Sequence, residues 1–194
     1  MGDYSRLNIK EYFPCVSANV RRSILNGINQ NKEHIKLSHK INGRWENQYL
    51  GYQFVPQIIE VFRFACKAGK ALAGRSVIIP YQGLGLSIDE YWFNVTLPYE
   101  STGWHDHKNN AILSGVYYLK VPSNSGDICF RQKINKSWDE FSIRSETGKM
   151  VIFDSNIQHS VSRNKSDDKR ISLAFNMYSY PLSLDFSSWN NEFN

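Results

Sequence analysis

The hydrophobic periodicity of this chain changes near residue 76, and this change limits the fold more than any other feature. Before it, apolar residues recur at helical spacing in two segments. After it, short runs of β-branched and aromatic residues are separated by clusters of Gly, Pro, Asn and Ser. Helices followed by many short strands predict a mainly β fold, a β-sandwich or jelly roll with supporting N-terminal helices.

The two predicted helices occupy the first third of the chain. The first runs from Ala18 to Asn29, with Ser17 as its N-terminal cap. The second follows Pro56, carries one broad apolar face and ends at Gly74. Residues 30–52 between the helices are polar, and we expect them to be irregular.

The predicted strands are short and begin after the second helix. The aromatic fraction of 14% suits large side chains packed between sheets. At 194 residues the chain is most simply a single domain, with a helical support segment over 1–75, a β core over 76–182 and a C-terminal tail over 183–194. The strands are predicted at 77–79, 86–97, 112–121, 127–131, 149–154 and 170–180.

Charge and cysteine content narrow the cellular setting. The net charge of +5 comes without a basic run longer than two residues, so we do not expect a nucleic-acid partner. Cys15, Cys66 and Cys129 are far apart, which indicates a reducing compartment rather than a disulfide framework. Neither a signal peptide nor an apolar stretch of membrane-spanning length is visible. We predict a cytoplasmic protein with no membrane partner, whose partner is a small-molecule or peptide substrate; a homodimer stays open.

Three of the five histidines fall at the edges of the β region. His105 and His107 are two apart, so in an extended chain their imidazoles point to one face while Asp106 points to the other. His159 follows another predicted strand and can supply a third nitrogen. Imidazole nitrogens suit iron, zinc, copper and nickel, so this pattern predicts a metal site.

A second feature, Arg170-Ile171-Ser172, follows eleven residues after His159. A guanidinium can hold a carboxylate through two charge-assisted hydrogen bonds, and a hydroxyl two residues on points to the same side of a strand. We therefore expect Arg170 and Ser172 to anchor a dicarboxylic co-substrate whose other end reaches the metal.

These features occur in an order that resembles the iron(II)/2-oxoglutarate-dependent oxygenases. The chain is most similar to a small, largely uncharacterised bacterial and phage branch that is distantly similar to prolyl hydroxylases. The resemblance covers residues 88–178 and hardly extends into 1–75. The motifs that carry it are Trp92-Phe93-Asn94, His105-Asp106-His107, Leu113-Ser114-Gly115-Val116-Tyr117-Tyr118-Leu119, Gly126-Asp127-Ile128, Gly148-Lys149-Met150-Val151-Ile152-Phe153, His159 and Arg170-Ile171-Ser172.

The resemblance implies a double-stranded β-helix (a cupin-like jelly roll), an Fe(II) cofactor, 2-oxoglutarate as co-substrate and O2 as oxidant. It implies oxidative decarboxylation of 2-oxoglutarate to succinate and CO2. By the same resemblance, His105 and His159 match the two histidine ligands of the metal. The residues that match or lie in the co-substrate pocket are Arg170, Ser172, Tyr118 and Asn94, of which Asn94 is inferred only from its strand.

One position departs from the family pattern. The usual third ligand is a carboxylate two residues after the first histidine, and this chain has His107 there. Three sites remain open: His107 as the ligand, Asp106 re-aimed by a bulge, or two histidines completed by water. We take His105, His107 and His159 as the catalytic metal ligands.

The leading hypothesis is an Fe(II)- and 2-oxoglutarate-dependent dioxygenase that hydroxylates an unidentified substrate. One alternative is a cupin-like metal-dependent dioxygenase or isomerase without 2-oxoglutarate. Another is a non-catalytic jelly-roll binding module. We assign no function to His34 and His39 in the polar N-terminal linker, and residues 136–144 are a candidate lid.

Overall fold

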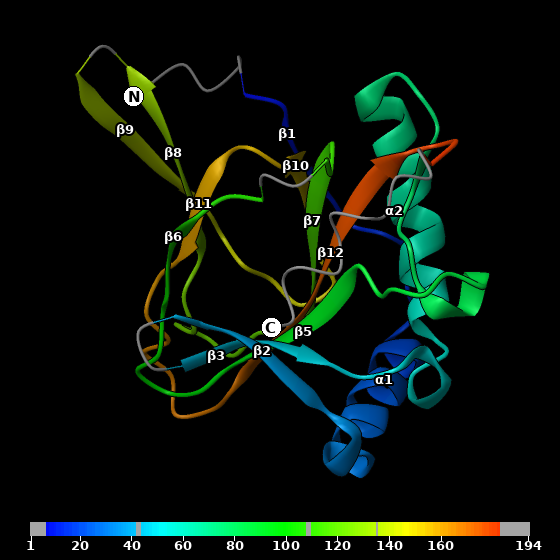
Figure 1. The fold of residues 1–194 in the computed structure, drawn as a ribbon. Coiled ribbons are helices and arrows are strands. Elements are labelled where there is room, and N and C mark those ends of the chain that lie inside the picture. The colour runs from blue at the N-terminus through cyan, green and yellow to red at the C-terminus, as the bar shows by residue number, and fades with distance from the viewer. Residues whose placement is uncertain (1–6, 42–43, 108–109, 135, 183–194) are drawn as a thin grey trace.

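The computed structural model describes residues 7–41, 44–107, 110–134 and 136–182. These residues form two antiparallel sheets with helices on the outer face of the larger one (Figure 1). The smaller sheet has the order β6 (Thr102–His105), β11 (Gln158–Val161), β8 (Ile128–Ile134) and β9 (Ser137–Ile143). Two antiparallel sheets that face each other form the predicted double-stranded β-helix.

The larger sheet has seven strands in a continuous path and an eighth beside it. Its order is β1 (Ile9–Tyr12), β10 (Met150–Asp154), β7 (Leu113–Lys120), β12 (Arg170–Ser179), β5 (Tyr91–Thr96), β3 (Arg44–Tyr49) and β2 (Lys36–Ile41), and β4 (Val77–Ile78) pairs with β12. Nine of the ten residues of β12 are buried because both faces of this central strand are covered.

The two helices confirm the predicted boundaries closely. Helix α1 spans Ala18–Gln30, and the Ser17 hydroxyl accepts a hydrogen bond from the backbone N–H of Val20 at 3.2 Å. Helix α2 spans Ile58–Ala73 and ends at Gly74, whose φ of 66° is the left-handed conformation that glycine adopts at helix ends. Three single-turn 3₁₀ helices complete the described helical segments: η2 (Lys32–His34), η3 (Tyr52–Phe54) and η4 (Gln82–Leu84).

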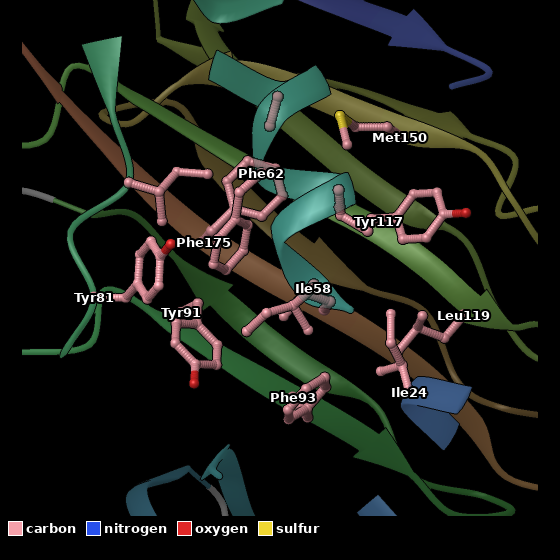
Figure 2. Packing of buried hydrophobic residues seen from close by; sticks show 14 of the residues in the cluster. Ile24, Ile58, Phe62, Tyr81, Tyr91, Phe93, Tyr117, Leu119, Met150 and Phe175 are labelled. Carbon is pink, nitrogen blue, oxygen red and sulfur yellow. The ribbon is translucent and has the colours of Figure 1, made fainter. Parts of the chain in front are cut away.

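The main hydrophobic core lies between the helices and the outer face of the larger sheet (Figures 1 and 2). Phe62 of α2 packs edge-on against Tyr91 and Phe175, with ring centroids 5.3 and 6.2 Å apart. Each fully buried side chain of this size contributes about 1.5–3 kcal/mol through removal of apolar surface from water. A second apolar cluster, which includes Phe130, Val151 and Phe153, lies between the two sheets. The inner face of the larger sheet is therefore partly apolar and partly open to the cavity described below.

The N-terminal third differs from its prediction as a helical segment with an irregular linker. Its residues also supply β1, β2 and β3, and β2 and β3 form a hairpin at the edge of the larger sheet. Backbone hydrogen bonds within the hairpin and to β5 hold these strands. Their side chains are mostly polar, so the sequence has no hydrophobic alternation that would predict strands here. The predicted tail over 183–194 lies outside the described residues.

Two further predictions need correction. The strand predicted from residue 86 begins at Tyr91, because η4 and the left-handed Gly85 (φ 77°) occupy the preceding turn. Residues 137–143 form β9, a largely exposed strand that pairs along β8 as a hairpin, and none of these described residues lines the cavity, so they are not a lid over it. Within the described residues, no helix is long and apolar enough to cross a membrane.

Candidate metal and co-substrate site

His105, His107 and His159 come together between the two sheets. His105 ends β6 and pairs directly with His159 on β11, so the antiparallel register brings these two imidazoles to one face. Their ring centroids are 4.2 Å apart, and the ring centroid of His107 lies 5.4 Å from that of His105 and 5.1 Å from that of His159. One nitrogen from each ring lies within 4.8 Å of the others, a spacing that can accommodate a metal ion.

Hydrogen bonds set the tautomers of two of these rings. Nδ1 of His105 is 2.9 Å from the carbonyl oxygen of Gly103, and Nδ1 of His159 is 3.0 Å from that of Ile157. A carbonyl oxygen only accepts, so Nδ1 carries the proton and donates in both rings. Each Nε2 therefore keeps its lone pair, which is the arrangement that metal-binding histidines use.

Burial keeps His107 and His159 neutral. Burial and the neighbouring rings of His105 and His107 hold the pKa of His159 well below its ordinary value. Burial, followed by the proximity of His105 and His39, lowers the pKa of His107 to about 3. Because a metal binds only deprotonated imidazole, these rings are already in the required state.

The donor set fits a divalent transition metal such as iron(II). Asp106 lines the cavity but does not belong to the group of three converging donors. The geometry therefore favours His107 over Asp106 as the third donor. A site with three neutral imidazoles carries one negative charge less than the usual triad, which weakens its electrostatic hold on the cation.

The residues predicted to bind the co-substrate lie on the facing larger sheet. On β12 the even-numbered residues point into the space between the sheets, and the odd-numbered ones pack against the helices. Ser172 is in register with Asn94 on β5 and with Tyr118 on β7. All seven predicted site residues line one cavity of about 1240 Å³: Asn94, His105, His107, Tyr118, His159, Arg170 and Ser172.

The Arg170 guanidinium is held firmly at one end of this cavity. Its side chain is buried, and Nη1 donates to the carbonyl oxygens of Ser125 at 2.9 Å and Gly126 at 3.0 Å. Its Nη2 donates to the Thr96 hydroxyl at 3.1 Å. These bonds fix the plane of the guanidinium, which reduces the entropy lost when it binds a carboxylate.

Tyr118 and Asn94 have different environments. Burial raises the pKa of the Tyr118 phenol, while the Ser145 hydroxyl and the Arg170 charge lower it, so the phenol stays protonated and can donate. Asn94 donates from Nδ2 to the backbone oxygen of Glu46 at 2.7 Å. Its amide thus holds β3 against β5, which is a positioning contact that the sequence did not reveal.

The sequence prediction missed one wall of the cavity. The β2–β3 hairpin contributes His39 and Asn47 among its lining residues, although residues 30–52 had been predicted to be irregular. Trp92 also lines the cavity, with its ring centroid 5.5 Å from that of His107. Trp92 stands in one of the family motifs, so it could have been found, whereas nothing in the hairpin sequence pointed to the site.

Comparisons with known proteins agree with this arrangement. Residues 90–176 match the family described as putative 2OG-Fe(II) oxygenase, and this range contains all seven predicted site residues. The carbocyclase SnoK of nogalamycin biosynthesis, described as non-heme and alpha-ketoglutarate dependent, has a similar structure, with a TM-score of 0.68, 14% identity, and coverage of 91% of this chain and 81% of that one. No curated protein matches at the level of sequence.

Two further solved structures share the fold. The epimerase SnoN, in complex with Fe3+, alpha-ketoglutarate and nogalamycin RO, gives a TM-score of 0.68 at 12% identity over 91% of this chain and 80% of that one. A prolyl-4-hydroxylase from Pseudomonas putida gives 0.55 at 15% identity over 91% and 89%. At these identities the likeness to the solved structures shows the shared fold alone. The argument for the chemistry rests on the family match over residues 90–176 and on the three converging histidines. The family match over residues 90–176, the shared fold and the three converging histidines together support the resemblance of this chain to the iron(II)/2-oxoglutarate-dependent oxygenases.

Proposed function

We propose that this chain is an iron(II)/2-oxoglutarate-dependent oxygenase that hydroxylates a small molecule or peptide, with iron(II) held by His105, His107 and His159. The observation that supports this most strongly is the placement of two complementary sets of residues across one cavity. The smaller sheet and the segment that follows β6 provide three imidazole donors, and the larger sheet provides Arg170, whose guanidinium is buried. A compound that chelates a metal at one end and carries a carboxylate at the other fits between them.

In this proposal each residue has a separate task. Arg170, Ser172 and Tyr118 bind the distal carboxylate of 2-oxoglutarate through N–H and O–H donors. Gly103 and Ile157 orient two imidazoles through their carbonyl oxygens. When bound, iron(II) with 2-oxoglutarate and O2 supplies the oxidising chemistry, and the co-substrate leaves as succinate and CO2.

The size of the cavity supports a second organic ligand beside the co-substrate. At about 1240 Å³ it exceeds the roughly 300–1,000 Å³ of most small-molecule sites, so 2-oxoglutarate fills only part of it. Trp92 beside His107 offers an aromatic surface on which a substrate can pack.

The carboxylate-binding residues separate this proposal from its rivals. A cupin-like enzyme without 2-oxoglutarate has no need for a buried guanidinium opposite its metal. A binding module without catalysis does not need three converging imidazoles. Both alternatives therefore leave part of the site unexplained. The unpaired state of Cys15, Cys66 and Cys129 supports our proposal that the protein works in a reducing compartment such as the cytoplasm.

The direct test is binding and turnover of 2-oxoglutarate by iron(II)-loaded protein. We expect succinate release that requires iron(II) and O2, and we expect His159→Ala to abolish it. His34→Ala is a matched control, because this half-exposed ring stacks on Phe54 outside the cavity. If iron-loaded wild-type protein binds no 2-oxoglutarate at millimolar concentration, the proposed function is wrong.

A further inference from the structure

His39 has an unusual backbone conformation in the hairpin wall of the cavity. It lies in the middle of β2, yet its φ is 55°. Positive φ is uncommon for residues with a Cβ atom, although His adopts it more readily than most, and residues in this conformation cluster at functional sites. His39 is also among the residues that line the cavity with His107 and Arg170.

The left-handed conformation changes the direction of the imidazole. In a regular strand, neighbouring side chains point to opposite faces, so Ser38 and His39 would lie apart. Here the Ser38 hydroxyl is 2.8 Å from Nδ1 of His39. Asn47, which pairs with Ser38 across the hairpin, places its amide Nδ2 3.2 Å from the same nitrogen. Two side chains thus hold one edge of the ring.

These contacts determine which ring nitrogen carries the proton. The amide nitrogen of Asn47 can only donate, so Nδ1 of His39 accepts, and in the neutral ring the proton sits on Nε2. His105 and His159 have the opposite tautomer, because their Nδ1 atoms donate to carbonyl oxygens. The structure therefore prepares those two rings to bind a cation and prepares His39 to donate a hydrogen bond.

The position of His39 places this donor on a different wall from Arg170. Arg170 begins β12 in the centre of the larger sheet, whereas His39 lies on β2 at its edge. Lys36, on the same strand, also lines the cavity, as do the acidic residues Glu46, Asp89 and Glu90, so this wall has no excess of positive charge. His39 and Asn47 of this wall line the same cavity as His105, His107 and His159. The cavity thus has a second group that can bind an oxygen acceptor.

We propose that His39 is a substrate-binding residue whose Nε2–H donates to an oxygen acceptor of the substrate. The proposal rests on the oxygenase function described above, with Arg170 occupied by 2-oxoglutarate. It assigns the substrate to compounds that carry an oxygen acceptor and a ring or apolar body, since Trp92 and Trp45 line the same cavity; an ammonium group cannot accept the hydrogen bond from His39.

The tautomer is the first test, and it does not depend on activity. Protein labelled with 15N-histidine and loaded with Zn(II) and 2-oxoglutarate is examined by long-range 1H–15N correlation at mildly alkaline pH. We expect His39 to carry its proton on Nε2, and His105 and His159 on Nδ1. A proton on Nδ1 of His39 would overturn the proposal.

The second test uses two probes of similar shape, phenylacetate and phenethylamine. Calorimetry is performed with protein saturated with Zn(II) and 2-oxoglutarate, so that Arg170 is already engaged. We expect phenylacetate to bind more tightly than the amine, and His39→Asn to weaken it about tenfold, the usual effect of losing one hydrogen bond to a charged group. Asn tolerates the left-handed backbone but is too short to reach the position of Nε2.

Two further variants complete this test. His39→Gln carries an N–H near the position of Nε2, and it should retain phenylacetate binding within about threefold. His34→Gln, outside the cavity, should have no effect. Equal affinities for acid and amine, or unchanged acid affinity in His39→Asn, would overturn the assignment of His39. Failure of the wild-type protein to bind 2-oxoglutarate would instead contradict the proposed oxygenase function, and the same titration detects it.

Discussion

The side chain of Arg170 has two roles that one substitution can separate. Arg170→Met keeps the apolar stem and removes the guanidinium. The loss affects three hydrogen bonds, to the carbonyl oxygens of Ser125 and Gly126 and to the Thr96 hydroxyl, at 2.9, 3.0 and 3.1 Å. It also removes the positive charge that we assign to the distal carboxylate of 2-oxoglutarate. The variant should therefore lose both stability and co-substrate affinity.

The expected losses differ in size. Two charge-assisted bonds to a carboxylate are together worth about 3–5 kcal/mol, so 2-oxoglutarate affinity should fall roughly 100- to 5,000-fold. Loss of the donors to these three acceptors should lower the free energy of unfolding by about 2–4 kcal/mol. The cost is no larger because water can partly replace the lost donors at the cavity surface. The binding effect is thus measurable even if the fold is weakened.

The assay is calorimetric titration of 2-oxoglutarate into Zn(II)-loaded protein, with urea unfolding of the same variants. Thr96→Val is the matched control, since it removes one bond to Nη2 and leaves the guanidinium in place. Its affinity should change less than tenfold. If Arg170→Met is destabilised as expected but keeps its affinity within threefold, Arg170 only pins the loop at Ser125 and our account of the co-substrate site is wrong.

Three further predictions concern the metal, pH and a turn. Zn(II) at 100 times its dissociation constant should stabilise the protein by about 2.7 kcal/mol in thermal unfolding, and His159→Ala should abolish that shift. In metal-free protein, His107 has a folded-state pKa of about 3, against about 6.5 in the unfolded chain. The unfolded chain therefore binds an extra proton below pH 6.5, so the free energy of unfolding in urea titrations should decline below that pH. His107→Asn should flatten this decline. Gly126 has a φ of 91°, and a methyl group there would collide with the backbone of Ser162; Gly126→Ala should cost more than about 2 kcal/mol in urea unfolding, whereas Gly85→Ala, also left-handed but in open space, should cost about 1.

The parts of the fold that were predictable are those in which burial follows a period. Helix α2 and the central strands have apolar faces fixed by the core, so their bounds differ from prediction by few residues. Strands β2 and β3 lie at the edge of the sheet, and side chains such as Lys36 and Trp45 remain exposed. Their pairing depends on backbone hydrogen bonds and tertiary position, which leave little trace in composition.

The candidate site shows the same division. The His105-to-His107 spacing and the Arg170-to-Ser172 pair are local patterns with a chemical reason, and the structure brings both into one cavity. The role of Asn94 in holding β3, and the presence of His39 in the wall, depend on contacts between segments more than 40 residues apart. No periodicity along the chain encodes such contacts.

The division of the site between two sheets has a consequence for how the molecule moves. His105 and His159 belong to the smaller sheet, whereas Arg170 belongs to the larger one that the helices support. A ligand that contacts the metal at one end and Arg170 at the other would link the two sheets. Amide hydrogen exchange in β6 and β11 should then slow most when metal and 2-oxoglutarate are present together, and less with either alone. We therefore expect the two sheets to become rigid relative to each other when the complete ternary complex forms.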